Sequence, residues 1–199
     1  MESTDDKDEV NAMDYQAVLF DFDYTLGDAT ASIYGGFCYG FEKMGLPKPR
    51  MEAVRETVGY ILEDGFTILT GERDEARRAE FRRWFQEKVE GRQAEMTRLF
   101  PGAAELLRAL HAQGIKVGVV TSKRRTTLHE ILSRYELLEL MTATVGGETV
   151  TRPKPDPEGL LGALETMGVE KRRALYCGDT TIDAATGQNA GVDFSAVLN

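Results

Sequence analysis

Cysteine and long apolar runs are both scarce in this sequence of 199 residues. Its two cysteines, Cys38 and Cys177, are too few for a disulfide framework, and the N-terminus lacks the basic and then apolar order of a signal peptide. No apolar stretch approaches the roughly 18 residues that would span a membrane. These absences favour a cytoplasmic protein that has no membrane partner.

Cations are also too few for a surface that binds nucleic acid. The chain has 24 lysines and arginines against 33 aspartates and glutamates, which gives a formal charge of −9. No excess of cations is therefore available to neutralise a phosphate backbone, and we expect no nucleic-acid partner. The residues before Tyr15 include six of the acidic residues and only Lys7 as a cation. We interpret residues 1–13 as a disordered acidic tail.

Hydrophobic residues make up 42% of the chain and charged residues 29%, which is the balance of a folded globular protein. Apolar runs predict strands at residues 17–20, 115–120, 143–145, 174–177 and 194–198. These runs are continuous rather than alternating, as is typical of strands covered on both faces. Segments with helical periodicity lie between the later runs. The pattern predicts an α/β fold with a Rossmann-like core of three layers around a parallel sheet.

The stretch at 28–98 interrupts this alternation because it contains several helical patterns and no convincing strand. Aromatic and aliphatic residues recur at helical spacing within 81–89, and residues 52–62 are interpreted as a further helix. An all-helical insertion after the first strand is the simplest arrangement. We predict that residues 14–27 and 99–199 form the α/β core and that residues 28–98 form a separate helical domain.

Polar clusters follow four of the predicted strands. In an open parallel sheet, ligands bind in the crevice outside the carboxyl ends of the strands, so these clusters are expected to converge there. Clustered carboxylates repel one another unless a cation lies among them, and hard oxygen ligands of this kind select Mg²⁺. Lysine and hydroxyl donors beside such an ion suit a phosphoryl group. The side chains concerned are Asp21, Asp23, Thr121, Ser122, Lys154, Asp179 and Asp183.

Four motifs occupy these positions. They are Asp-x-Asp-x-Thr-Leu-x-Asp at 21–28, Val-Thr-Ser-Lys at 120–123, Lys-Pro-Asp-Pro at 154–157 and Gly-Asp-x-x-x-Asp at 178–183. In content and order they resemble the four signature motifs of the haloacid dehalogenase superfamily, and most of all its phosphoglycolate phosphatase-like branch. The resemblance covers residues 15–199. It implies a helical cap inserted after the first motif, which corresponds to the helical domain predicted at 28–98.

The resemblance implies roles for five of these residues. Asp21 would be the nucleophile that forms an aspartyl-phosphate, and Asp23 would protonate the leaving oxygen and then activate water. The dehalogenases of the superfamily lack the second aspartate, so its presence favours phosphoryl chemistry. Thr121 and Lys154 would hold the phosphoryl oxygens, with the backbone near Ser122 assisting.

The same resemblance implies a Mg²⁺ site. Asp21, Asp179 and the backbone carbonyl of Asp23 would hold the ion, and Asp183 would bind it directly or through water. The implied activity is the Mg²⁺-dependent hydrolysis of a phosphate monoester, with a small phosphorylated metabolite as partner. A sugar phosphomutase, a pyrophosphatase and a catalytically idle relative that binds a phosphorylated ligand stay open as alternatives.

Two features depart from this family pattern. Tyr24 stands where these phosphatases usually have glycine, which puts a bulky ring beside the acid-base loop. The sequence also ends at Asn199, where relatives usually continue with a turn and a helix, so we expect a chain that is shortened at this end. We expect a monomer or a weak homodimer, and the motifs themselves do not name the substrate.

Overall fold

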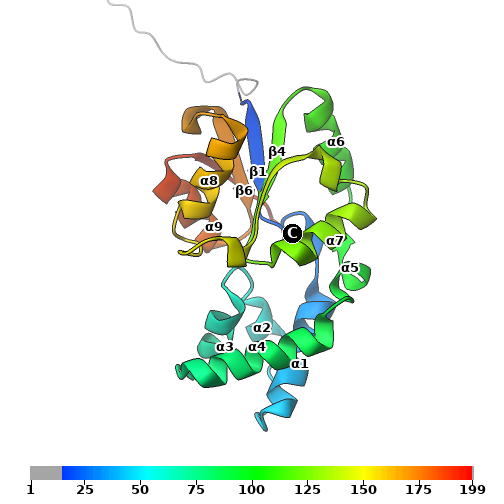
Figure 1. Ribbon diagram of the computed structural model, residues 1–199, viewed down its shortest axis with the longest axis vertical. Coiled ribbons are helices and arrows are strands. Elements are labelled where there is room, and N and C mark those ends of the chain that lie inside the picture. The colour runs from blue at the N-terminus through cyan, green and yellow to red at the C-terminus, as the bar shows by residue number, and fades with distance from the viewer. Residues whose placement is uncertain (1–14, 199) are drawn as a thin grey trace, which may run out of the picture.

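A parallel sheet of five strands forms the centre of the larger part of the molecule, in the order β5-β4-β1-β6-β7 (Figure 1). The computed structural model describes residues 15–198, so the tail predicted at 1–13 lies outside the described residues. All five predicted strands are present, and each end lies within two residues of the prediction. The strands are β1 (Ala17–Phe20), β4 (Lys116–Val120), β5 (Met141–Val145), β6 (Ala174–Gly178) and β7 (Asp193–Ala196).

Strand β1 is apolar on both faces because helices cover both faces of the sheet (Figure 1). Ala17 and Leu19 belong to one core cluster, and Val18 and Phe20 to the other, with at most 6% of each residue exposed. This division explains the continuous apolar run and confirms the predicted α/β fold. The covering helices are α8 (Glu158–Met167) and α9 (Thr181–Ala190) on one face, and α6 (Ala103–Ala112) and α7 (Arg125–Arg134) on the other.

A separate group of helices lies beyond the carboxyl ends of the strands (Figure 1). Its buried interior consists of five phenylalanines and two valines, and the rings of Phe66 and Phe81 stack with their centroids 4.4 Å apart. Helices α1 and α4 approach closely, since a Cβ added to Gly36 would lie only 2.5 Å from the ring of Phe85. The group comprises α1 (Thr30–Lys43), α2 (Met51–Arg55), α3 (Leu62–Thr70) and α4 (Glu75–Val89).

The single helix predicted at 52–62 is wrong. Helix α2 ends at Arg55 and α3 begins at Leu62, and between them Gly59 has a φ of +103°, which no helix contains. A short loop at 57–61 therefore separates the two helices.

Two short strands join the helical group to the core. Strand β2 (Gly27–Asp28) pairs antiparallel with β3 (Arg98–Leu99), at the points where the chain leaves and re-enters the core. Helix α5 (Gln93–Met96) precedes β3 and contacts α7. Three short 3₁₀ turns, all in the core, are η1 (Leu138–Leu140), η2 (Gly147–Thr149) and η3 (Lys171–Arg173).

Within residues 15–198, none of the helices has the length and apolar character needed to cross a membrane.

Candidate active site

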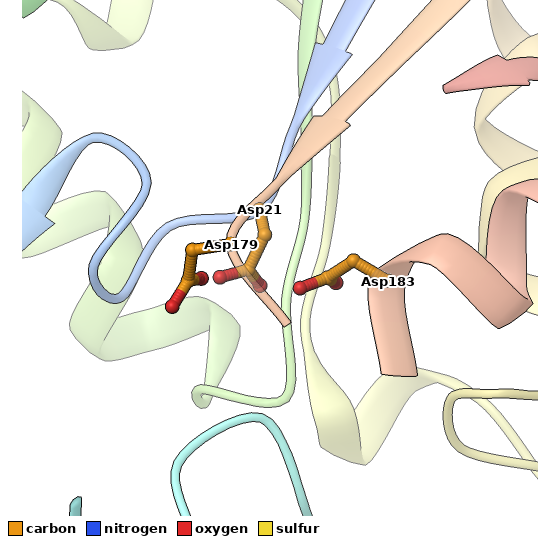
Figure 2. Close-up of side chains that lie close together, drawn as sticks. All are labelled: Asp21, Asp179 and Asp183. Carbon is orange, nitrogen blue, oxygen red and sulfur yellow. The ribbon is translucent and has the colours of Figure 1, made fainter. Parts of the chain in front are cut away.

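Three carboxylates from separate segments meet at the carboxyl edge of the sheet. Asp21 follows β1, Asp179 follows β6, and Asp183 lies in the first turn of α9. Figure 2 shows Asp21 between the other two. Each residue offers an oxygen that lies within 4.8 Å of those of the other two. The backbone N–H of Asp21 donates to the carbonyl of Cys177 at 2.8 Å, so pairing between β1 and β6 fixes the position of this aspartate.

Lys154 lies between two of these carboxylates. Its Nζ is 2.7 Å from Asp21 Oδ1 and 2.6 Å from Asp183 Oδ1, and all three side chains are almost completely buried. Burial alone lowers the pKa of Lys154, but the charge of Asp21, together with that of Asp183, outweighs burial and holds this pKa well above its usual value. The two carboxylates therefore favour the charged form of Lys154.

The carboxylates around Asp21 outnumber the cations near them, so a further cation would stabilise the site. The pKa of Asp21 is raised to about 7, mainly by burial and also by the charge of Asp183, against the opposing charge of Lys154. Burial also raises the pKa of Asp179. Carboxylate oxygens are the ligands that hard divalent cations select, so the residues present fit such an ion.

Asp183 accepts hydrogen bonds at both of its carboxylate oxygens. The hydroxyl of Tyr176 lies 2.8 Å from Oδ1, the oxygen that also accepts from Lys154, while the backbone N–H and the hydroxyl of Thr180 donate to Oδ2. Thr180 Oγ1 in turn accepts from the N–H of Asp183 at 3.1 Å, which completes a capping box at the start of α9. Burial opposes ionisation of Asp183, but Lys154 and these hydrogen bonds bring its pKa below the usual value. Asp183 thus holds Lys154 in place.

Asp23 has a different environment. Its Oδ2 lies 3.1 Å from Lys123 Nζ in a buried ion pair. Its Oδ1 is buried and has no hydrogen-bond partner among the residues that the structure describes. A buried acceptor without a partner is energetically costly, and Asp23 also lines a cavity. Among the described residues, Asp23 therefore has one paired and one unpartnered carboxylate oxygen.

Thr121 and Ser122 follow β4. The N–H of Thr121 donates to the carbonyl of Val145 at 3.0 Å, and its buried Oγ1 accepts from the N–H of Lys123 at 3.3 Å. Thr121, Ser122 and Lys154 all line one small pocket. The structure therefore brings all seven residues singled out in the sequence to the same edge of the sheet.

Three further side chains contact this site although the sequence analysis assigned them no role. Lys123 pairs with Asp23, Tyr176 lies against Asp183, and the hydroxyl of Thr25 donates to Asp179 Oδ1 at 3.1 Å. Thr25 and Lys123 lie inside two of the quoted motifs, which was an available signal. Tyr176 gave none, because within an apolar strand it resembles any other core residue.

A cavity of about 800 Å³ lies between the strand ends and the helical group. The core contributes polar side chains to it, among them Asp23, Ser122 and Lys123. The helical group contributes apolar side chains, among them Ile33, Phe37, Phe85 and Val89, and the loop at 57–61. The cavity thus has a polar wall beside the carboxylate cluster and a mainly apolar wall facing it.

The sequence and the fold are both similar to those of known hydrolases. Residues 18–197 match the family model of haloacid dehalogenase-like hydrolases. The chain is 34% identical to a phosphoglycolate phosphatase from Cereibacter sphaeroides, over 89% of this chain and 83% of that protein. It is 31% identical to the pyrophosphatase PpaX from Halalkalibacterium halodurans, over 93% of this chain and 84% of that protein. A crystal structure of a haloacid dehalogenase-like hydrolase from Bacteroides fragilis superposes with a TM-score of 0.88 and 36% identity, over 92% and 87% of the two chains.

The chain therefore belongs to the haloacid dehalogenase-like hydrolase family. Within that family it is a phosphatase, as the resemblance of its motifs implied. The resemblance stated from the sequence is confirmed.

Proposed function

We propose that this phosphatase hydrolyses the phosphate monoester of a small metabolite, with the help of Mg²⁺ and through an aspartyl-phosphate on Asp21. One observation carries the proposal. Lys154 is held against Asp21 in a buried site, while the unpartnered Oδ1 belongs to Asp23, which lines the neighbouring cavity. This arrangement separates a nucleophile with its phosphate-binding cation from a group that can transfer protons.

The first half of the reaction transfers the phosphoryl group to the enzyme. The carboxylate of Asp21 forms a bond to phosphorus as the bond to the leaving oxygen breaks, and Asp23, which enters this step in its protonated form, gives its proton to that oxygen. Lys154 and Thr121 hold the phosphoryl oxygens during this transfer. In the second half, Asp23 removes a proton from water, the water oxygen bonds to phosphorus, and the bond to Asp21 breaks. Inorganic phosphate leaves, and both aspartates return to their starting states.

Mg²⁺ is the cation that the donor set fits best. Asp21, Asp179 and the backbone carbonyl of Asp23 would hold it, with Asp183 as a direct or water-mediated ligand. Both oxygens of Asp183 already accept hydrogen bonds, which favours the contact through water. When bound, the ion neutralises part of the negative charge of the carboxylates and the phosphate.

We propose further that the helical group, which lies within the domain predicted at residues 28–98, acts as a cap over the site. Its side chains form the apolar wall of the cavity, so they would contact the leaving group and exclude water from it. A cytoplasmic location and a monomeric or weakly dimeric state remain predictions from the sequence.

Relatives suggest the first substrates to test, phosphoglycolate and pyrophosphate. The cavity of about 800 Å³ falls in the range that holds larger ligands, so sugar phosphates and nucleotides belong in the same panel. We expect release of inorganic phosphate from at least one monoester. A preference for pyrophosphate over every monoester would instead favour the pyrophosphatase alternative, and an isomerised sugar phosphate would favour the mutase.

Replacement of the nucleophile tests the covalent step. We expect Asp21→Asn to reduce kcat by at least about 1,000-fold, because an amide is a far weaker nucleophile than a carboxylate. Acid-quenched wild-type enzyme should carry one phosphate on the peptide that contains Asp21, as measured by mass spectrometry. Asp74→Asn, on the exposed cap of α4, is the matched control and should leave kcat unchanged. Activity within tenfold of wild type in folded Asp21→Asn protein would exclude the covalent mechanism.

Chelation tests the metal. EDTA should abolish hydrolysis and Mg²⁺ should restore it, whereas excess Ca²⁺ should inhibit because its longer and more variable coordination misplaces the phosphate. Mg²⁺ should also raise the Tm of the wild-type protein, and raise it less in Asp179→Asn. Full activity after exhaustive chelation would contradict the proposal.

A further inference from the structure

Tyr24 has a backbone conformation that residues with a large side chain seldom adopt. Its φ is 63°, in the left-handed region, and its N–H donates to the carbonyl of Gly27 at 2.8 Å. A hydrogen bond from the backbone of Tyr24 therefore closes the tight turn that follows Asp23. Such conformations persist where the surrounding structure holds the residue in place.

Two residues of the helical group contact the side chain of Tyr24. Its hydroxyl lies 2.9 Å from Thr30 Oγ1, at the start of α1. The guanidinium carbon of Arg55, at the end of α2, lies 4.8 Å from the centroid of the ring. A guanidinium over an aromatic face is attractive, and only 6% of Tyr24 is exposed. The ring is thus buried between the start of α1 and the end of α2.

This contact is independent of the covalent connections between the two parts of the molecule. The chain passes from core to helical group through β2 and returns through β3. Tyr24 provides a third link, which begins one residue from Asp23 and ends on α2. Displacement of α2 would remove Arg55 from the ring and so act on the turn that carries Asp23.

The segment after α2 also contacts the core. A Cβ added to Gly59 would lie 3.3 Å from Thr180 Cγ2, so the loop at 57–61 touches the residue whose hydroxyl binds Asp183. Helix α2 and this loop therefore contact the core at two residues, Tyr24 and Thr180. In this arrangement the helical group lies directly against the catalytic edge.

We infer that Tyr24 is a positioning residue, whose ring, held by Arg55 and Thr30, keeps the Asp23 turn in its working geometry while the helical group contacts the core. The inference rests on the proposed function for the acid-base role of Asp23. Loss of the contact with Arg55 lets the turn relax, which impairs proton transfer to the leaving oxygen. Substrate binding depends on the cavity walls and is largely unaffected.

A double-mutant cycle tests this inference with β-glycerophosphate, whose alkoxide leaving group needs a proton. We expect Arg55→Met to lower kcat about fivefold, the size expected for an exposed cation over an aromatic ring, with KM within about twofold. Tyr24→Leu should lower kcat at least as much, and adding Arg55→Met to it should cause no further loss. Arg55→Lys should retain most of the activity, and Arg73→Met, on the exposed surface of the helical group, should behave as wild type.

Hydrogen exchange provides a readout that does not depend on turnover. In Arg55→Met, the backbone amides of residues 22–27 should exchange faster than in wild type, whereas those of β1 should not change. Unchanged exchange in this turn, or losses of kcat that multiply in the double variant, would overturn the inference. If Tyr24→Leu does not fold, Arg55→Met with its lysine rescue still decides the question. A wild-type enzyme that is inactive on all esters would count against the proposed function instead, and the exchange experiment would still test Tyr24.

Discussion

At the carboxyl edge of the sheet, Lys154 is buried between Asp21 and Asp183, whereas the buried interior of the helical group is made of phenylalanine and valine. The helical group has many charges too, but its ion pairs are partly or largely exposed, and one of them borders the cavity. Arg82 lies 2.6 Å from Glu63, with about half of the arginine side chain exposed. The two regions therefore differ in where they place their charged side chains.

Exposed and buried ion pairs contribute differently to the free energy of unfolding. Exposed ion pairs contribute about 0 to 1 kcal/mol, so those of the helical group serve mainly to keep its surface hydrated. Buried ion pairs are weak sources of stability, because desolvation offsets the attraction between the charges. A cluster such as that of Asp21, Lys154 and Asp183 is better explained by the chemistry it performs. Packing sets the shape of the helical group, and charge sets the activity of the core.

Removal of the buried cation Lys154 should have the largest effect on activity and on stability. Lys154→Met leaves two buried carboxylates without their cation, so we expect kcat to fall by at least about 100-fold and the metal-free protein to lose about 3 kcal/mol of unfolding free energy. Steady-state kinetics and urea denaturation measure the two effects. Lys171→Met, at an exposed lysine of η3, should change neither quantity. A fully active Lys154→Met enzyme would show that the cluster is structural.

The sequence predicted the core better than the helical group, for physical reasons. Strand β1 was located to the residue because burial on both faces produces a continuous apolar run at 17–20. The largely exposed strand β7 was placed less closely. The site residues could be grouped because parallel strands bring their carboxyl ends together. The break at Gly59 was missed, since a helical pattern of apolar residues continues across it and only the backbone torsion reveals the loop.

Other parts of the site depend on contacts that no local pattern contains. Tyr176 lies outside the four motifs, and its hydroxyl reaches Asp183 only because β6 and α9 pack together. The ion pair of Lys123 with Asp23 joins the loops after β4 and β1. The cavity likewise exists only where the helical group meets the core. These features follow from tertiary packing rather than from sequence spacing.

Two adjacent glycines allow the packing of the helical group to be tested with a smaller expected effect. A Cβ on Gly36 would lie 2.5 Å from the ring of Phe85, whereas one on Gly35 would meet nothing within 4 Å. We expect Gly36→Ala to destabilise the protein by about 1 to 2 kcal/mol through overpacking, and Gly35→Ala to stabilise it by about 0.5 to 1 kcal/mol through helix propensity. Chemical denaturation measures both. Hydrolysis of p-nitrophenyl phosphate should persist in each variant, and equal stability of the two would contradict the close approach of α1 and α4.

Alkylation of the cysteines should have the smallest effect on activity. One cysteine lies in each region, Cys177 in the core and Cys38 in the helical group. Cys177 is buried in β6, and burial raises the pKa of its thiol to about 11, so at pH 8 only about one molecule in 1,000 has the reactive thiolate there. Cys38, in α1, is partly exposed and does not line the cavity. Iodoacetamide should therefore label one thiol in the native protein and two in urea, and native labelling should disappear in Cys38→Ser. Because the labelled thiol lies outside the site, kcat should stay within about twofold of the untreated enzyme; labelling of native Cys177 would mean that the sheet edge opens far more readily than the buried cluster of charges implies.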